Sequence, residues 1–386
     1  MPSIRQFAFC LSIAAAATTI ANAQAVRTLR LPRGAIQPQA AVDDNGAIDL
    51  LYFQGEPQHG DLYFVQWTDG VGDFKSPLKV NQHPQSAIAI GNIRGAHLAV
   101  GRDNRVHVAW MGSDRAQPKA PGNASPMLYT RLDDAGEEFE PERNVIAANV
   151  GLDGGGSLAA DREGNVYVAW HAPKLGQRGE ENRRVWVARS RDDGDLFEPE
   201  QLAFDEPTGC CGCCGMRAMT DDEGALLILY RSAEEKVHRD MHLLTSGNQG
   251  QTFLGAKIAD WPAETCVMST ASLALGINGP LAAWETEGQV YFGRINPANG
   301  RVEKPIAAPG ATGKRKHPVL TTNGEGDILL AWTEGMGWER GGSAAWQVFD
   351  SSGRPLPGGR GKAEGVPVWS LVAVAVQPDG DFVIIY

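Results

Sequence analysis

The most distinctive stretch of the sequence is a run of cysteines between glycines, with the letters GCCGCCG. Its four thiols are those of Cys210, Cys211, Cys213 and Cys214. Because glycine lets the backbone fold tightly, four sulfur atoms within five residues can converge on one point. Converging sulfur atoms can bind a soft metal ion, form disulfides or exchange electrons.

Three interpretations of these thiols remain open. An oxidising compartment favours a disulfide between loops. However, adjacent cysteines pair only through a strained ring, and Cys266 brings the cysteines beyond the N-terminal leader to five. Clustered thiolates beside Met and His side chains suit Cu(I) or zinc. A redox-active dithiol is the third interpretation, but no C-x-x-C motif stands at the expected start of a helix.

Seven hairpin patterns along the chain must position these thiols. Each consists of an alternating apolar strand, a polar turn and a second apolar strand that ends in Trp or Tyr. The closing aromatic lies six residues after a turn residue, and the turn residues are Gly46, Asn104, Gly164, Gly224, Asn278, Gly326 and Gly380. Recurrence at 48 to 60 residues is typical of a repeat architecture.

Two further strand-like runs follow most hairpins, which gives four strands per repeat. Four-stranded units repeated around an axis predict an all-β fold, a β-propeller of seven blades by hairpin count. The last hairpin ends at the C-terminus without its outer strands, and Val26 to Leu31 is expected to supply one of them. Residues 24–386 are therefore expected to form a single propeller domain.

The hairpin register predicts which loops meet at one end of the propeller. The loops that lead into the inner strands, here called lead-in loops, carry sulfur and imidazole groups in blades four, five and six, which are consecutive. The expected metal ligands are Cys210, Cys211, Cys213, Cys214, Cys266, Met268 and His317. If the segment from Cys266 to Met268 is extended, both of its sulfur atoms face the same side.

Loops between second and third strands should reach the same end and form a rim. The expected rim residues are His171, Arg231, Arg239, Asp240, His242, Glu285, Glu334, Trp338 and Trp369. The two glutamates suit a general acid and base, or simply cap strand ends. The two tryptophans could stack on a sugar, or only fill the rim.

Two octapeptides recur between third and fourth strands, with the spacing S-x-D/N-x-G-x-x-F. Their defining residues are Ser190, Asp192, Gly194, Phe197, Ser246, Asn248, Gly250 and Phe253. This pattern resembles the Asp box of the sialidase-like β-propellers, and a weaker copy runs from Asp134 to Phe139. The resemblance covers nearly the whole chain after residue 23, and implies a structural motif on the face opposite the active site. It also implies six blades, one fewer than the hairpin count.

Active members of that family carry Arg-Ile-Pro at the first inner strand, where the arginine binds the substrate carboxylate. Here the proline in register is Pro38, so that Ile36 occupies the arginine position. The similar letters Arg30-Leu31-Pro32 lie upstream of the hairpin. The resemblance therefore implies the fold, and we do not expect a competent sialidase.

The N-terminus has the pattern of a signal peptide over residues 1–23. Arg5 precedes an apolar run from Phe7 to Ile20, and Ala21-Asn22-Ala23 fits a cleavage site. We expect a secreted or periplasmic protein without a transmembrane segment. Loss of Arg5 changes the formal charge from −11 to −12, which argues against a nucleic-acid partner.

These features predict a propeller that binds a soft metal ion, copper preferred. Such a protein would store or deliver the copper, or use it to oxidise a substrate. One alternative is a glycan-binding or glycan-cleaving propeller in which disulfides hold the cysteine loop. Another is a scaffold for a second exported protein. As an enzyme, the chain would be a copper-dependent oxidoreductase or a glycoside hydrolase. The expected partner is a metal ion or small ligand, and the expected state is a monomer.

Overall fold

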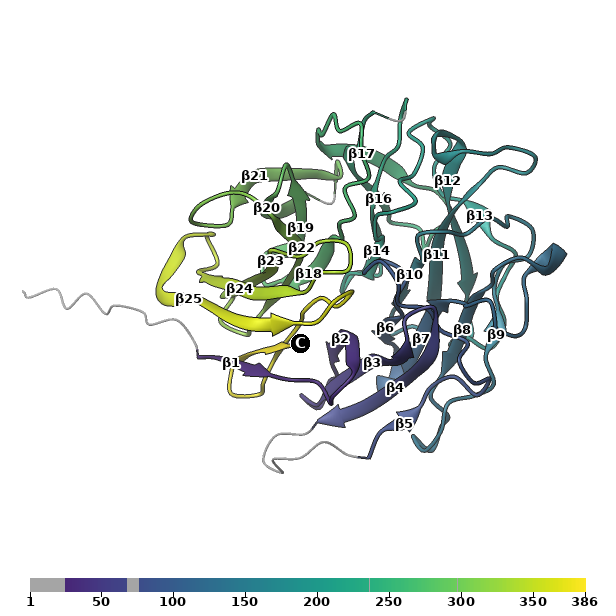
Figure 1. Cartoon of the computed structure of the whole chain (residues 1–386), viewed down its shortest axis with the longest axis horizontal. Coiled ribbons are helices and arrows are strands. Elements are labelled where there is room, and N and C mark those ends of the chain that lie inside the picture. Colours follow the sequence, from purple (N-terminus) through teal and green to yellow (C-terminus); the bar gives the residue numbers. More distant parts are fainter. Residues whose placement is uncertain (1–24, 68–75, 236, 297) are drawn as a thin grey trace, which may run out of the picture.

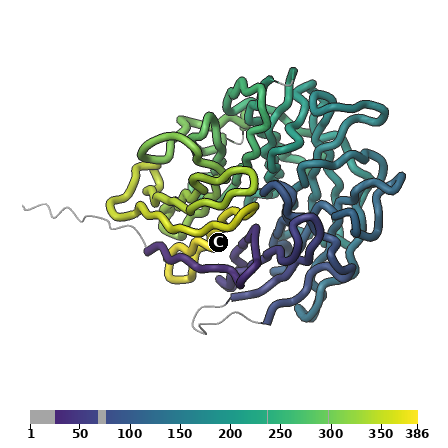
Figure 2. The backbone as a smooth tube through the Cα atoms, in the orientation of Figure 1, coloured from purple at the N-terminus to yellow at the C-terminus, as the bar shows by residue number. Residues whose placement is uncertain are grey.

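Seven β-sheets stand around a central axis in the computed structural model (Figure 1). The structure describes residues 25–67, 76–235, 237–296 and 298–386, so the expected signal peptide lies outside the described residues. The colour along the tube in Figure 2 passes once around this ring, so that blades consecutive in sequence are neighbours in space. The seven-bladed propeller predicted from the hairpin count is confirmed, and the six-bladed alternative is wrong.

Six blades are four-stranded and antiparallel throughout, with strand order equal to chain order. The strands of blades one to three are β2 (Ala35–Val42), β3 (Ile48–Glu56), β4 (His59–Trp67), β5 (Leu78–Lys79), β6 (His97–Val100), β7 (Val106–Met111), β8 (Met127–Arg131), β9 (Arg143–Asn144), β10 (Gly156–Ala160), β11 (Val166–Pro173), β12 (Arg183–Ser190) and β13 (Gln201–Leu202). Those of blades four to six are β14 (Arg217–Thr220), β15 (Leu226–Arg231), β16 (Met241–Ser246), β17 (Leu254–Ala259), β18 (Ser272–Gly276), β19 (Gly279–Thr286), β20 (Gln289–Asn296), β21 (Arg301–Ala307), β22 (Arg315–Thr322), β23 (Ile328–Glu334), β24 (Gly342–Phe349) and β25 (Pro355–Val366).

The seventh blade joins the two ends of the chain. It consists of β26 (Ala373–Val376), β27 (Phe382–Ile385) and the N-terminal strand β1 (Val26–Leu29), which pairs parallel with β27. The N-terminal segment therefore supplies the third strand that the last hairpin lacks, as the sequence predicted.

Polar side chains shape the turns between inner and second strands. In blade one, the Asp43 carboxylate accepts hydrogen bonds from the backbone N–H groups of Asn45 and Ala47, at 2.9 and 2.8 Å. Gly46 adopts a φ of 79°, which glycine tolerates best. The aromatic residue that closes each hairpin is buried between the sheets; these residues are Tyr52, Trp110, Trp170, Tyr230, Trp284, Trp332 and Tyr386. Burial of these large rings explains why the pattern repeats with a fixed offset.

The turns between third and fourth strands of blades three and four share one hydrogen-bond pattern. Ser190 Oγ accepts from the Gly194 amide at 2.9 Å, and Asp192 Oδ1 accepts from the Leu196 amide at 3.0 Å. In blade four, Ser246, Asn248 and Gly250 repeat these roles. Phe197 and Phe253 pack against the cores between blades. Ser, Asp or Asn, Gly and Phe therefore each have a structural role in the turn.

Strand direction divides the molecule into two faces. The lead-in loops and the loops between second and third strands lie at one end, here called the upper face, and the hairpin turns lie at the other. Only three short 3-10 turns break the β structure of the described residues: Arg102–Asn104, Pro121–Asn123 and Glu180–Asn182. No helix in the described part is long and apolar enough to cross a membrane.

Candidate functional site

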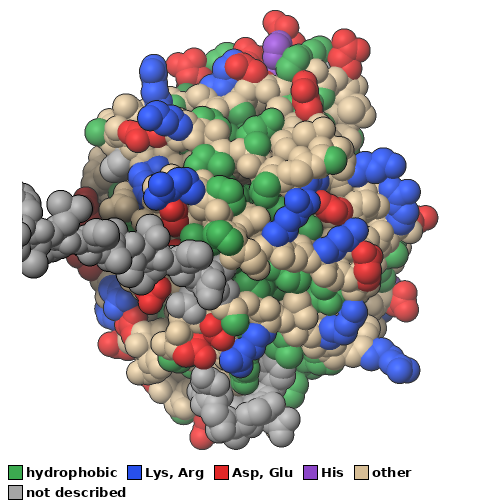
Figure 3. Space-filling view, turned by 90° about the vertical axis from the view of Figure 1, so that its left-hand side faces the viewer, with side chains coloured by type: hydrophobic (Ala, Val, Ile, Leu, Met, Phe, Trp, Pro, Cys, Tyr) green, Lys and Arg blue, Asp and Glu red, His purple; other side chains and the backbone are tan. Residues whose placement is uncertain are grey.

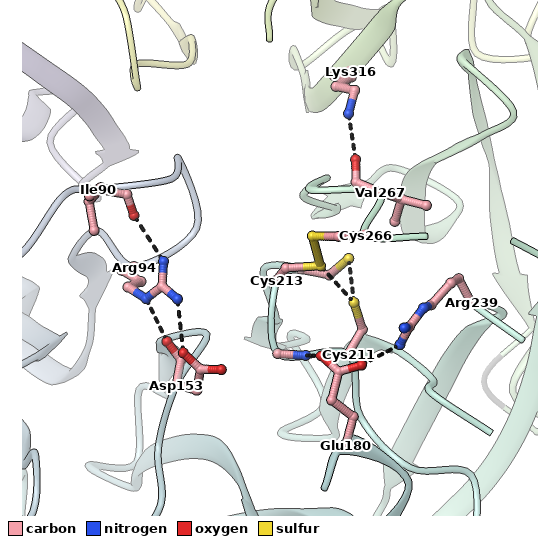
Figure 4. Close-up of a disulfide and its surroundings, with 12 residues drawn as sticks. Ile90, Arg94, Asp153, Glu180, Cys211, Cys213, Arg239, Cys266, Val267 and Lys316 are labelled. Carbon is pink, nitrogen blue, oxygen red and sulfur yellow. Dashed lines mark hydrogen bonds and ion pairs between the residues drawn. A yellow bond between two sulfur atoms is a disulfide. The ribbon is translucent and has the colours of Figure 1, made fainter. Parts of the chain in front are cut away.

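Four of the five cysteines in the described residues form one sulfur cluster on the upper face (Figure 4). The Sγ atom of Cys211 lies 3.3 Å from that of Cys213 and 3.0 Å from that of Cys214. The ligand atoms of these three residues all lie within 4.8 Å of one another. Cys213 is joined by a disulfide to Cys266, which belongs to the lead-in loop of blade five. We call Cys211, Cys213, Cys214 and Cys266 the sulfur cluster.

Backbone hydrogen bonds fix the loop that carries the first three cysteines. The Cys211 amide donates to the Arg231 carbonyl at 2.9 Å, and the Gly215 amide donates to the Ser269 carbonyl at 2.9 Å. The Gly212 amide donates to Glu180 Oε1 at 3.0 Å. The loop is therefore attached to blade three, to its own blade and to blade five at the same time.

Glycine at position 212 lets the loop lie against a neighbouring ion-pair network. A Cβ atom there would overlap with Nη1 of Arg183 and lie 2.8 Å from Oδ2 of Asp153. Asp153 binds Arg94 at 2.8 Å and Arg183 at 3.2 Å. This network holds the lead-in loops of blades two and three beside the cysteine loop (Figure 4).

Two buried guanidinium groups give the cluster a positive surrounding. Burial, the largest effect, raises the pKa of Cys214, but the Cys211 thiol that donates to its sulfur and the charge of Arg231 outweigh it. The net effect holds the pKa of Cys214 below its ordinary value. The hydrogen bond to Cys214, followed by burial, raises the pKa of Cys211. Arg239 also lies close enough to favour a negative charge on both sulfur atoms. Of the two thiols, Cys214 therefore loses its proton more readily and Cys211 keeps its own.

Cys210, an expected ligand, lies apart from the sulfur cluster. Its side chain is buried in the core between blades three and four, where Met216 and Tyr230 are also found. Burial raises the pKa of its thiol to about 12. The Cys210 amide donates to the Glu180 carbonyl at 3.0 Å, whereas the Cys211 amide donates to the Arg231 carbonyl, so the two neighbours are attached to different blades.

His317 is not part of the group of converging ligand atoms, and Met268 lies outside the strands. The inner strand β18 begins only at Ser272, and Met268 has a φ of 45°. The interpretation of Cys266 to Met268 as an extended strand is therefore wrong. His317 lines the central channel, and its Nδ1 atom lies 3.4 Å from Thr270 Oγ1. Burial lowers its pKa to about 3, so the imidazole is neutral at pH 7.

Two expected rim arginines are structural supports of the cysteine loop. Arg231 is buried, donates to the carbonyls of Arg239 and Glu285 at 2.6 and 2.7 Å, and lies over the Trp261 ring. Arg239 donates to Glu180 Oε2 at 2.8 Å. Glu180 therefore connects Arg239 to the amide of the cysteine loop.

Three further rim residues, Asp240, His171 and His242, are buried. Asp240 is buried and accepts from the Trp261 amide at 2.7 Å. His171 and His242 are buried, and burial lowers their pKa values to about 3 and about 4. Both ring nitrogens of His171 lack a hydrogen-bond partner among the described residues. These groups do not form an open binding surface.

The two expected acid–base residues have different surroundings. Glu285 is 1% exposed, and burial raises its pKa. Glu334 accepts from Trp332 Nε1 at 3.0 Å and pairs with Arg315 at 3.3 Å. Neither glutamate lines the central channel. Neither residue therefore supplies a carboxylate to the channel lining.

Trp338 and Trp369 form an aromatic pair on the upper face. Their ring centroids are 6.0 Å apart and the rings meet edge to face. Trp338 is 53% exposed, which is uncommon for so large an apolar side chain. The pair offers an exposed aromatic surface near the mouth of the channel.

Three residues that hold the site in place were absent from the sequence-based set. Glu180, Asp153 and Arg183 contact the cysteine loop, yet each is a common charged residue with no motif around it. Their relation to the cysteines depends on long-range packing, so no local signal could have found them.

No protein-family model matches this chain, and no curated protein matches it. Solved structures with the same fold do match. A protein of unknown function from Dyadobacter fermentans is 16% identical with a TM-score of 0.56, and the match covers 89% of this chain and 97% of that one.

Two further matches are glycan-related proteins. An alpha-L-arabinanase from Penicillium chrysogenum, complexed with arabinobiose, is 12% identical over 86% of this chain and 99% of that one, with a TM-score of 0.53. A Trypanosoma rangeli sialidase in complex with the inhibitor DANA is 10% identical over 85% of this chain and 55% of that one, with a TM-score of 0.51. At these identities the matches show a sialidase-like propeller fold and nothing about activity.

Proposed function

We propose that this chain is an exported propeller that binds a soft metal ion, Cu(I) preferred, at its sulfur cluster. The observation that carries this proposal is the convergence of the sulfur atoms of Cys211, Cys213 and Cys214 within 4.8 Å. Thiolate sulfur is the ligand type that Cu(I) and zinc favour in proteins. With Cys266 beside Cys213, a reduced cluster offers four sulfur ligands.

The charges around the cluster support a bound metal–thiolate group. Several thiolates around a monovalent ion carry net negative charge, which is unfavourable in a buried site unless cations offset it. Arg231 and Arg239 are buried beside the cluster and supply two positive charges. An all-sulfur ligand set suits the soft ion Cu(I), while four cysteines can also hold zinc, so the preference for copper is decided by the metal analysis below.

The redox state of the disulfide sets how many ligands are available. While Cys213 and Cys266 are joined, the thiols of Cys211 and Cys214 remain as ligands. Reduction of the disulfide by an added reductant gives two more thiols, and these thiols lose their protons when they bind a metal ion. We therefore expect tighter metal binding after reduction.

The decisive experiment measures copper in the purified protein. The full chain is expressed with export into copper-supplemented periplasm, purified without oxygen, and analysed for copper and zinc per chain before and after mild reduction. We expect about one Cu(I) per chain in the wild type, with a much weaker affinity in the double variant Cys211→Ser, Cys214→Ser. A chromogenic Cu(I) chelator in competition gives the affinity.

Cys210→Ala is the matched control, because Cys210 is adjacent in sequence but buried outside the cluster. It should retain copper while removing one thiol. Equal copper in the double variant and the wild type would contradict the proposal, as would reduced wild type that retains no metal. Zinc without copper would keep the thiolate site but overturn the preference for copper.

The exposed aromatic pair supports a second candidate, a glycan-binding function at the channel mouth. A sugar ring can stack on Trp338, whose side chain is more than half exposed. Two structural neighbours carry glycan ligands or inhibitors in their names, which suggests probes. Hydrolysis is less well supported, because the described residues that line the channel include no carboxylate.

Titration with arabinobiose and with a sialoside, followed by tryptophan fluorescence, tests this candidate. If Trp338 binds the sugar, Trp338→Ala abolishes the fluorescence change, while the double cysteine variant retains it. No saturable change in the wild type with either sugar would remove glycan binding without affecting the metal proposal.

A further inference from the structure

The central channel of the propeller contains one unneutralised positive charge. The channel has a volume of about 570 Å³ and is lined mainly by apolar and small side chains of the inner strands. Among its described lining residues, none is Asp, Glu or Lys, and Arg217 is the one arginine. No described carboxylate forms an ion pair with Arg217.

Arg217 reaches across the channel from blade four toward blades one and two. It is the first residue of β14, and its Nη1 atom donates to Gln39 Oε1 of β2 at 3.0 Å. The same nitrogen lies 3.2 Å from Nδ1 of His97, the first residue of β6. No described residue accepts from its Nε or Nη2 atoms. The edge of the guanidinium with two parallel N–H bonds is therefore free.

The pairing of inner and second strands shows what surrounds this guanidinium. Arg217 pairs with the residue just before the closing aromatic of its hairpin. The positions with the same pairing in blades six and seven hold Val319 and Ala373, and both line the channel. The corresponding positions in blades three and five hold Ser157 and Ser272, so apolar side chains occupy this register only in blades six and seven.

The imidazoles of the channel do not add to or balance this charge. Burial, followed by the nearby Arg217 charge, lowers the pKa of His97 well below its ordinary value. Burial also lowers the pKa of His317. Both are neutral at pH 7, whereas Arg217 stays protonated, because burial lowers its pKa only to about 10. The described channel lining therefore carries one net positive charge, on a side chain that is partly exposed to the channel.

We propose that Arg217 is the binding residue of a channel site for a small monocarboxylate. A single cation is neutralised by one monovalent anion, and the free Nε–Nη2 edge matches two carboxylate oxygens. The apolar side chains of Val319 and Ala373 suit the carbon end of such a ligand. This site is independent of the sulfur cluster, since no cysteine lines the channel.

Direct observation of the Arg217 side chain tests the site in the intact protein. Acetate is titrated into ¹⁵N-labelled wild type, and the arginine Nε–H resonances are followed by NMR. The resonance that disappears in Arg217→Lys identifies Arg217. We expect it to shift in a saturable way with acetate, whereas chloride at the same ionic strength leaves it in place because a spherical ion does not match the paired donors.

Variants of Arg217 then test whether the paired N–H donors matter in addition to the positive charge. Arg217→Lys keeps the positive charge but lacks the paired donors of the guanidinium, and it should weaken acetate binding about tenfold in calorimetry. Arg217→Met should abolish it, while Arg162→Met, which removes an exposed arginine, should leave it unchanged. Far-ultraviolet circular dichroism checks that each variant is folded.

Three results would overturn the proposal: no acetate-dependent shift of the Arg217 resonance, equal acetate affinity in wild type and Arg217→Lys, or chloride binding as tight as acetate. The last two would reduce the site to a simple charge. Because the wild-type titration needs no variant, a misfolded Arg217→Met protein does not prevent a decision.

Discussion

At the scale of single residues, Gly212 decides whether the cysteine loop can lie where it does. Replacement by alanine would place a methyl group against Asp153 and Arg183, whose ion pair joins the loop to its neighbours. We expect Gly212→Ala to weaken Cu(I) affinity at least tenfold and to lower the free energy of unfolding by about 1–3 kcal/mol. Chelator competition and urea denaturation measure the two effects.

Gly324→Ala is the matched control for this substitution. Gly324 lies in a hairpin turn of blade six, its φ is not positive, and a Cβ atom there meets nothing within 4 Å. It should leave both quantities unchanged. If Gly212→Ala behaves like Gly324→Ala, close packing at Gly212 does not matter for the site.

Buried histidines predict how stability depends on pH. Burial lowers the pKa values of His107, His171 and His317 from 6.5 to about 3. The unfolded chain binds these protons near pH 6.5 and the folded chain does not, so the free energy of unfolding falls as the pH drops from 6.5 toward 3. Between pH 7.0 and 5.5, each histidine should contribute a loss of about 1 kcal/mol.

Urea denaturation at the two pH values measures this loss. His107→Asn should reduce it by about 1 kcal/mol, whereas the exposed His83→Asn should not change it. An equal pH dependence in His107→Asn and wild type would show that His107 is not held neutral by the fold.

At the scale of elements, the disulfide between Cys213 and Cys266 joins the lead-in loops of blades four and five. It closes a loop of 53 residues, for which the loss of chain entropy in the unfolded state predicts a stabilisation of about 4 kcal/mol. Cys266→Ser, or reduction of the wild type, should lower the free energy of unfolding by up to this amount. Urea denaturation with and without reductant measures it.

Reductant should have no further effect on Cys266→Ser, and Cys210→Ala should respond to reductant as the wild type does. Addition of Cu(I) to reduced wild type should restore part of the stability if the four thiolates bind it, since a ligand that binds the folded state stabilises it. A wild type whose stability is indifferent to reductant would show that this disulfide does not form.

At the scale of the whole molecule, the ring is closed by hydrogen bonds between the two chain ends. The Leu31 amide donates to the Tyr386 carbonyl at 2.9 Å, and the Tyr386 amide donates to the Leu29 carbonyl at 3.0 Å. Leu29 and Leu31 also pack against the core between blades seven and one. Deletion of residues 24–31 should therefore lower the free energy of unfolding by about 3 kcal/mol or more.

A chain that begins at Gln24 is the control, because it retains β1. The longer deletion also exposes the edge of β27, which should promote association visible by size-exclusion chromatography. If both chains unfold at the same urea concentration, the pairing of β1 with β27 does not contribute to the free energy of unfolding.

One face of the molecule carries charges of both signs. In the view of Figure 3, Lys and Arg side chains are interspersed with Asp and Glu among the described residues, without a continuous basic area. Export and a monomeric state remain predictions.

The sequence alone determined the repeat, the number of blades and the closure by the N-terminal strand. These features depend on local periodicity, on turn residues such as Gly46 and on a buried aromatic at a fixed offset, all of which can be read along the chain. Strand direction then predicted that the loops holding Cys213 and Cys266 meet on one face, and the structure brings them together.

Only the tertiary structure decided the chemistry of the individual groups. In the structure, Cys210 lies in a core between two blades, apart from the other cysteines, and Met268 does not continue an extended strand. Arg217 lies in a channel whose described lining contains no carboxylate. The pKa and reactivity of each group depend on burial and on charges far away in sequence, such as Glu180 beside the cysteine loop. Such neighbours leave no pattern along the chain, because any of many charged residues could have occupied those places.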